Sequence, residues 1–351
     1  MITSATTKST PVGRHALDRF REWVLRGSFS RAAAVDRQTG ELLDSEARAL
    51  FASLPLITPA TSPEEWVSQG LVRRVPPGLR EALTTPRYRP GRELFVRTET
   101  QFATRGGPVA GYQPGGRRAI THRATLLKRH GEMFMVEVAG APTPLLFPAN
   151  EVYRLNEPRG IPATGGTLTG VQVDYNDPLM RAHLAAAAIE LGDAIAALDL
   201  SSPTPQTIEA QRRLVYRLAS RVRMAYPGHG DGYAGHRAAS LLSYGVGVCF
   251  VQRTVAAALL QPFARLLGFD LQLAVGRTLK HDVPHGFLII MLRPSMLRWV
   301  CDPAWQEPAT DLRVAFFDAG WGHDRRLVDF EGDAELSVSP LDVDLPEVEV
   351  A

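Results

Sequence analysis

Residues 244–252 read Tyr-Gly-Val-Gly-Val-Cys-Phe-Val-Gln, and apolar residues then recur at helical spacing as far as Gly268. This pattern predicts a glycine-containing turn that leads into a helix beginning at Cys249. A thiol at a helix N-terminus lies near unpaired backbone N–H groups and the positive end of the helix dipole, which favour the thiolate and bind an oxyanion. Gly247 leaves room for a substrate carbonyl to approach. Cys249 is therefore a candidate nucleophile, in a helix that Pro262 is expected to kink or split.

An antiparallel hairpin is predicted after this helix. One apolar run begins at His285, the chain turns around Pro294 and Ser295, and a second run ends at Asp302. If Pro294 and Ser295 lie at the centre of the turn, the residue numbers of each cross-strand pair add up to 589, so Asp302 lies opposite Phe287. Alternate residues of a strand share a face, so His285 lies on the same face as both. A register one residue different would put the two polar side chains on opposite faces. The hairpin thus offers an imidazole and a carboxylate within reach of each other in one of two registers.

Cys249, His285 and Asp302 supply the groups that nucleophilic acyl transfer needs. The thiolate attacks, the imidazole accepts and returns a proton, and the acid orients the imidazole. The order of these residues resembles that of the transglutaminase-like branch of the papain-like cysteine enzymes, over about residues 205–310. The matching motifs are Gly247-Val248-Cys249, Leu266-Leu267-Gly268-Phe269, His285-Gly286-Phe287 and Asp302-Pro303-Ala304-Trp305. Two departures are Gly286-Phe287, where the family often has Ala-Trp, and the proline within the nucleophile helix.

The resemblance implies an α+β fold with a papain-like, transglutaminase-like C-terminal domain, in which helices pack on an antiparallel sheet. It also implies that a carboxamide or peptide-like acyl group forms a thioester with Cys249, which an amine or water resolves. The expected substrate is a protein, a peptide or a small amide, and no cofactor is needed. Tyr244 is a candidate donor to the oxyanion, and Trp305 a candidate wall of the substrate cleft.

Several alternatives remain open. A catalytically inactive scaffold that binds a protein partner would keep the fold and lose the chemistry. Arylamine N-acetyltransferases share the triad, but their Arg-Gly-Gly before the cysteine is absent here, which disfavours a coenzyme A donor. His281 competes with His285 as the base, although it falls in a polar loop. Strand alternation points Cys301 away from Asp302, into the core.

A metal site is not predicted. His229, Asp231 and His236 lie together in a glycine-rich segment, but they lack recognised ligand spacing. That segment precedes the nucleophile in the chain, so it is also a candidate border of the substrate cleft.

Hydrophobic periodicity changes along the chain and suggests five parts. A capping box at Ser62-Pro63-Glu64-Glu65 predicts a helix in the first part, and Asp177-Pro178 and Thr204-Pro205 predict helix starts in the fourth. Strands are expected at 94–102, 119–127, 133–138 and 151–155. The parts are a helical N-terminal region (1–89), a small all-β segment comparable to an SH3-like barrel by strand number (90–156), a linker (157–170), the catalytic domain (171–330) and an acidic tail (331–351).

Composition excludes several classes of protein. The chain has 351 residues, with 39 Lys+Arg, 37 Asp+Glu and two cysteines, too few for a disulfide framework. No run of about 18 apolar residues predicts a membrane span, and no signal-peptide pattern is present, so a cytoplasmic location is expected, with signal-independent export left open. No basic run with interleaved aromatic residues suggests a nucleic-acid partner. The oligomeric state does not follow from the sequence.

Overall fold

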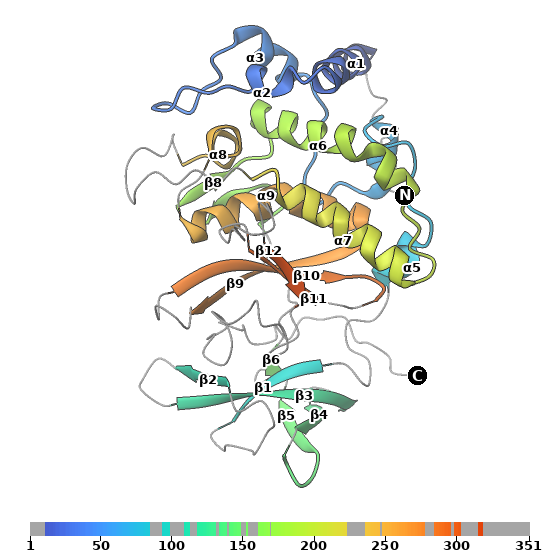
Figure 1. Ribbon diagram of the computed structural model, residues 1–351, viewed down its shortest axis with the longest axis vertical. Coiled ribbons are helices and arrows are strands. Elements are labelled where there is room, and N and C mark those ends of the chain that lie inside the picture. The colour runs from blue at the N-terminus through green and yellow to red at the C-terminus, as the bar shows by residue number, and fades with distance from the viewer. Residues whose placement is uncertain are drawn as a thin grey trace, which may run out of the picture. The chain divides into compact units, whose positions relative to one another are not determined.

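In the computed structural model the chain divides into two compact units. Figure 1 labels the helices and strands of both. The first comprises Met1–Leu83, Gly160–Phe269 and Pro303–Val314, and the second Thr84–Arg159, Asp270–Asp302 and Ala315–Ala351. The structure describes residues 11–84, 93–98, 109–112, 118–130, 133–138, 140–148, 152–153, 161–168, 170–222, 236–245, 248–277, 284–295, 298–302 and 315–318. The N-terminal helices thus group with those that follow residue 160, whereas the five sequential parts inferred from the sequence stay a prediction.

The described helices all belong to the first unit. They are α1 (Pro11–Leu25), α2 (Phe29–Ala32), α3 (Ser45–Ala52), α4 (Pro63–Ser68), α5 (Leu79–Thr84), α6 (Pro178–Ala197), α7 (Pro205–Ala219), α8 (Ala238–Tyr244) and α9 (Cys249–Leu267), the last residue of α5 crossing the boundary. The capping box that predicted α4 is confirmed, because Ser62 N–H donates to Glu65 Oε2 at 2.6 Å and Glu65 N–H donates to Ser62 Oγ at 3.2 Å.

Helix α6 is the buried element around which the first unit packs. Asp177 caps its N-terminus by accepting a hydrogen bond from Leu179 N–H at 2.8 Å, as the Asp-Pro pair predicted. Small and apolar residues cover most of its circumference, and Ala185 and Ala188 are fully buried. Because alanine allows backbones to approach closely, α6 contacts α1, α3, α7, α8 and α9.

Helix α9 begins at Cys249 and is ended by Gly268, the residue after Leu267, as the sequence predicted. Gly268 has φ 67°, a left-handed conformation that glycine adopts without steric cost. The buried side chain of Gln211 donates to the backbone oxygens of Leu267 and Gly268, each at 2.7 Å. Of the two outcomes expected at Pro262, a kink or a split, the split does not occur, since α9 continues through the proline. Proline removes one backbone hydrogen bond, while buried residues on either side, such as Phe263, hold the turn by packing.

Part of the predicted linker forms a hairpin. Strands β7 (Gly166–Leu168) and β8 (Val171–Val173) pair antiparallel around Gly170, whose φ is 76°. The same segment is fastened to α9, because the backbone N–H of Ile161 donates to Gln261 Oε1 at 2.6 Å and Gln261 Nε2 donates to Ile161 O at 2.7 Å. Val171 and Val173 are both buried and alternate with an exposed residue, which explains why β8 forms a strand. The surrounding glycines had suggested a linker instead.

The described strands of the second unit form two sheets, and Phe269 at the start of β9 belongs to the first unit. The first has the order β5-β4-β3-β1-β6, with β2 also paired to β3. Its strands are β1 (Glu93–Thr98), β2 (Val109–Tyr112), β3 (Arg118–His130), β4 (Met133–Val138), β5 (Leu145–Pro148) and β6 (Val152–Tyr153). The four predicted strands correspond to β1, β3, β4 and β6. Phe134, Val136 and Val138 are buried on one face of β4, so the period-two pattern that predicted this strand is confirmed.

The second sheet has the order β12-β11-β10-β9. Its strands are β9 (Phe269–Arg277), β10 (Pro284–Leu292), β11 (Arg298–Asp302) and β12 (Ala315–Asp318), of which β12 was not predicted. Arg293, in the turn after β10, forms a buried ion pair with Asp270 at 2.8 Å. The combination of helices with small antiparallel sheets confirms the α+β class.

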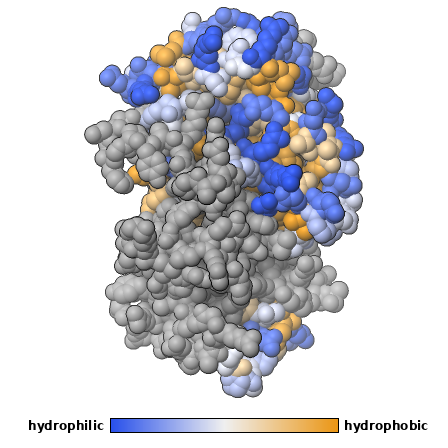
Figure 2. All heavy atoms as spheres, in the orientation of Figure 1, coloured by the Kyte–Doolittle hydropathy of each residue, from blue (hydrophilic) through white to orange (hydrophobic). Residues whose placement is uncertain are grey.

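The surface of the described residues mixes hydrophilic and hydrophobic side chains on the face shown in Figure 2. The exposed large apolar side chains are spread along the chain at Leu25, Leu43, Leu56 and Leu146. Such isolated residues are normal on protein surfaces. Among the helices that the structure describes, none combines the length and hydrophobicity that crossing a membrane requires.

Candidate active site

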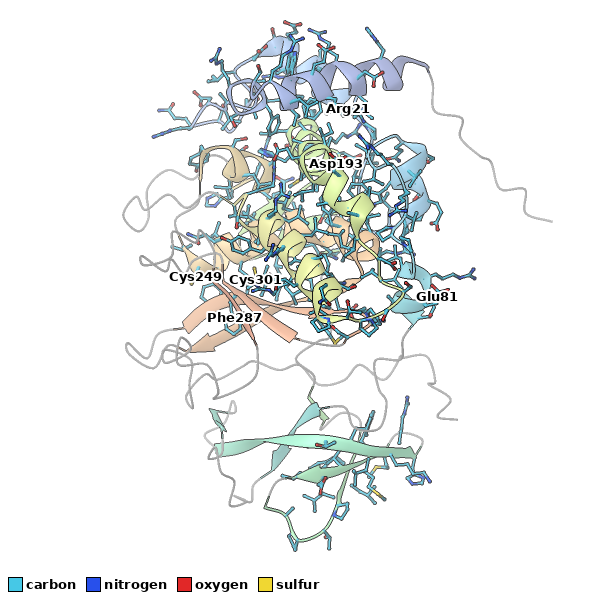
Figure 3. The ribbon with its side chains drawn as sticks, turned by 45° about the vertical axis from the view of Figure 1, so that its right-hand side comes forward. Arg21, Glu81, Asp193, Cys249, Phe287 and Cys301 are labelled. Atoms are coloured by element: carbon cyan, nitrogen blue, oxygen red, sulfur yellow. The ribbon has the colours of Figure 1, made fainter. Side chains whose placement is uncertain are left out.

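The turn before Cys249 places its thiol at the first residue of α9, labelled in Figure 3. Helix α8 is followed by its C-cap residue Gly245, which has a φ of 113° that favours glycine. The backbone N–H of Gly245 donates to Leu241 O at 2.9 Å. Val248 is the N-cap of α9, and its apolar side chain cannot accept a hydrogen bond from the first turn. The backbone N–H groups of this turn therefore have no side-chain cap, and the thiol of Cys249 is half-buried.

A buried cation lies one helical turn after the thiol. Arg253 is four residues beyond Cys249 on α9, and its residue exposure is 5%. Its guanidinium lies 5.2 Å from the centroid of the Phe250 ring. Side chains on a helix lean toward its N-terminus, so Arg253 covers the turn that contains the thiol.

The charges of Arg253 and Cys249 interact. Burial lowers the pKa of the Arg253 guanidinium, because the charged form loses its hydration, and the negative charge of Cys249 acts in the opposite direction. The attraction is reciprocal, since the electrostatic free energy that favours the guanidinium also favours the thiolate. The first turn of α9 thus offers a positive charge in addition to its helix dipole.

Sequence reasoning missed this cation. Three consecutive polar residues at the start of α9 are almost completely buried: Gln252 at 1%, Arg253 at 5% and Thr254 at 0% exposure. Thr254 satisfies its hydroxyl by donating to Phe250 O at 3.0 Å. The spacing of four residues between Cys249 and Arg253 was visible in the sequence and would have placed the arginine beside the thiol, although not its burial.

The predicted hairpin register is confirmed. Strands β10 and β11 are antiparallel, with Leu288 paired to Cys301 and Met291 to Arg298, so the paired numbers sum to 589. The next pair in this register would be Phe287 with Asp302. His285 lies two residues before Phe287 on β10, so positions 285 and 302 share a face of the sheet. For His285 and Asp302 the structure describes the strand positions, which are the second residue of β10 and the last residue of β11.

Cys301 is fully buried, as its position on the opposite face to Asp302 predicted. Leu288, its partner across the hairpin, is also fully buried. The apolar side chains of β10 are buried on both faces, since Phe287 and Met291 on the other face are at most 3% exposed. Figure 3 labels Cys301 and Phe287 on the two strands.

Tyr244 is the last residue of α8 and is half-buried, five residues before the thiol. Gly247, Trp305 and the alternative base His281 lie outside the described residues. Cys249 and Tyr244 belong to the first unit, whereas His285 and Asp302 belong to the second. That the thiol, the imidazole and the carboxylate meet stays a prediction.

The structure gives no cluster that would hold a metal within its described part, where no three His, Cys, Asp or Glu side chains come together in a suitable arrangement. Of the three candidate ligands, His229 and Asp231 lie outside this part. The third, His236, has φ 49°, and its backbone oxygen accepts a hydrogen bond from Gln172 N–H at 2.8 Å.

A scan of the sequence against protein-family models gave no match, and searches among curated proteins and solved structures gave no significant similarity. The resemblance to transglutaminase-like enzymes therefore rests on the ordered motifs around Cys249, His285 and Asp302. What the described geometry adds is a thiol at a helix start beside a buried guanidinium, and a hairpin that places a histidine and an aspartate on one face.

Proposed function

We propose that the protein catalyses cysteine-dependent acyl transfer from a carboxamide or peptide-like donor. In this proposal, Cys249 attacks the acyl carbon, and His285 delivers the thiol proton to the departing amine as the C–N bond breaks. The resulting thioester is attacked by an amine or by water, with His285 accepting the proton of the attacking group and returning it to the sulfur. Asp302 holds His285 in the required tautomer and orientation.

The observation that carries the proposal is the hairpin register. Of the two registers open to the sequence, the one observed puts His285 and Asp302 on the same face, whereas the other would have separated them. The start of α9 supports the same chemistry, because Arg253 and the helix dipole both favour a thiolate at Cys249. The backbone N–H groups at a helix N-terminus, here preceded by Val248 without a side-chain cap, are suited to an oxyanion, with Tyr244 as a further donor.

The proposed chemistry also implies a more specific fold than the α+β class. We infer a papain-like, transglutaminase-like C-terminal domain in which helices pack on an antiparallel sheet, and a barrel-like closure of the segment that contains β1 to β6. Trp305 and Gly247 would border the cleft, and the substrate would be a protein, a peptide or a small amide. No cofactor has a role in this chemistry. A cytoplasmic location stays a prediction from the sequence.

Mass spectrometry after treatment with iodoacetamide tests the proposed nucleophile. Near neutral pH, Cys249 should be alkylated at least tenfold faster than Cys301, which is fully buried. The His285→Ala variant should lose this fast reaction, because the imidazole no longer accepts the thiol proton. His281→Ala, a change of the same kind in the competing histidine, is the matched control and should react like the wild type.

A second assay tests acyl transfer itself. A glutamine-containing dipeptide is incubated with hydroxylamine, and the hydroxamate that forms is measured in the wild type and in Cys249→Ala. Formation that depends on Cys249 supports the transferase, and release of ammonia without hydroxamate indicates that water resolves the thioester. Slow alkylation of Cys249 that neither histidine variant changes would instead indicate a scaffold without catalytic activity.

A further inference from the structure

A separate cavity of about 490 Å³ lies within the first unit. Its walls come from α2, α6, α7 and α8, and its volume is within the ~300–1,000 Å³ range of small-molecule sites. Cys249 is not among the residues that line it. The cavity is therefore a candidate binding site that is distinct from the proposed nucleophile.

One wall holds a buried polar pair. His183 is a polar residue within the buried stretch of α6, with 7% of its surface exposed. Its Nε2 lies 2.8 Å from Ser243 Oγ, and its ring meets the ring of Phe29 edge to face, with centroids 5.2 Å apart. The hydroxyl and the aromatic ring together hold the imidazole in one orientation at the cavity wall.

Another wall carries positive charge. Arg217, in the last turn of α7, and Arg221, just after that helix, both line the cavity. Glu190 also lines it and forms an ion pair with Arg221. Two guanidinium groups against one carboxylate leave an excess of positive charge, which favours a negatively charged ligand.

Arg221 also has an unused donor. Its Nε is buried and has no hydrogen-bond partner among the described residues. A buried donor without an acceptor is unfavourable, because it has lost its hydrogen bonds to water. An anionic oxygen in the cavity would remove this cost and would add a charge-assisted hydrogen bond.

We propose that the cavity binds a small organic anion, a carboxylate or a phosphate monoester joined to a flat apolar body. The anionic group lies against Arg217 and Arg221, and the apolar body rests on Phe29. The pair formed by His183 and Ser243 hydrogen-bonds to a polar atom of the ligand. The guanidinium groups fix the charge of the ligand, while a volume of about 490 Å³ suits a small molecule.

Isothermal titration calorimetry of the full chain tests this site with benzoate, phenyl phosphate and phenol. Benzoate or phenyl phosphate should bind at least tenfold more tightly than phenol, and the tighter of the two identifies the preferred anion. Arg221→Met should weaken that binding at least tenfold. Arg213→Met, which removes an exposed arginine of α7 from outside the cavity, is the matched control and should bind like the wild type.

Equal affinity of the anions and phenol, no binding of either anion, or equal affinity in Arg221→Met and Arg213→Met would overturn the proposal. Circular dichroism establishes whether each variant is folded. If Arg221→Met fails to fold, Arg217→Met and Ser243→Ala carry the same test, because they remove a second charge and the partner of His183. Unchanged affinity in both would also refute the site, and none of these results depends on the reactivity of Cys249.

Discussion

Replacing Arg253 with methionine tests whether a buried guanidinium stabilises the Cys249 thiolate. Side chains four residues apart on a helix have Cβ atoms about 5–6 Å apart. Two unit charges at ~6 Å attract by about 3 kcal/mol at an effective dielectric constant of ~20, and by about 0.7 kcal/mol in bulk water. Since about 1.4 kcal/mol corresponds to one pH unit, the midpoint of thiol alkylation should rise by about 0.5–2 pH units in Arg253→Met.

The midpoint of alkylation should rise because the thiolate is negatively charged and the thiol is neutral. A neighbouring cation favours the thiolate over the thiol, so the wild type reaches its full alkylation rate at a lower pH than the variant. The assay measures the rate of iodoacetamide labelling at Cys249 by mass spectrometry between about pH 5 and 10, a range that brackets an ordinary thiol. Below both midpoints, the variant should react more slowly by a factor of roughly 3–100, which is the same free energy expressed as a rate.

Two further variants separate charge from packing. Arg253→Lys keeps the positive charge and should retain most of the effect. Arg265→Met removes an arginine from the same helix sixteen residues beyond Cys249, about 24 Å along the axis. That distance exceeds the ~10 Å Debye length, so the midpoint should stay at its wild-type value. An unchanged midpoint in folded Arg253→Met would refute the electrostatic reasoning.

Three other changes have defined outcomes. Asp302→Asn should slow hydroxamate formation at least tenfold, because the amide no longer holds the imidazole in the required tautomer; full activity would exclude Asp302 from the site. Gly268→Ala should lower the free energy of unfolding by about 1–3 kcal/mol in denaturant titrations, since the residue has φ 67° and an added Cβ would lie 2.9 Å from Leu200 Cδ1. Ser62→Ala removes half of the capping box with Glu65 and should cost about 1 kcal/mol in the same measurement, and equal stability would contradict the role of the cap.

Local sequence signals predicted the elements that position the candidate site. The start of α9 followed from glycines before Cys249 and apolar spacing after it, and its end followed from Gly268. The hairpin followed from two apolar runs around Pro294, and its centre gave the correct register. These features depend on backbone conformation at glycine and turn residues and on runs of apolar residues, both of which a short stretch of sequence specifies.

Other features depend on packing between distant segments, which local patterns do not specify. The burial of Arg253 could not be inferred, because an arginine near a helix start is usually exposed. Continuity of α9 through Pro262 depends on neighbours such as Trp66, whose ring lies 4.7 Å from that of Phe263. Strand β7 was hidden because its glycines favoured a linker, whereas the hairpin depends on apolar residues of β8.

The most direct test of the account is the distance from the Cys249 sulfur to the nearer ring nitrogen of His285 in a crystal structure of the protein. The proposed mechanism predicts about 3–4 Å, slightly longer than an ideal hydrogen bond, as is usual in enzymes without substrate. A separation beyond about 8 Å, with the two side chains in separate solvent-exposed or buried environments, would contradict proton transfer between them and with it the proposed catalysis.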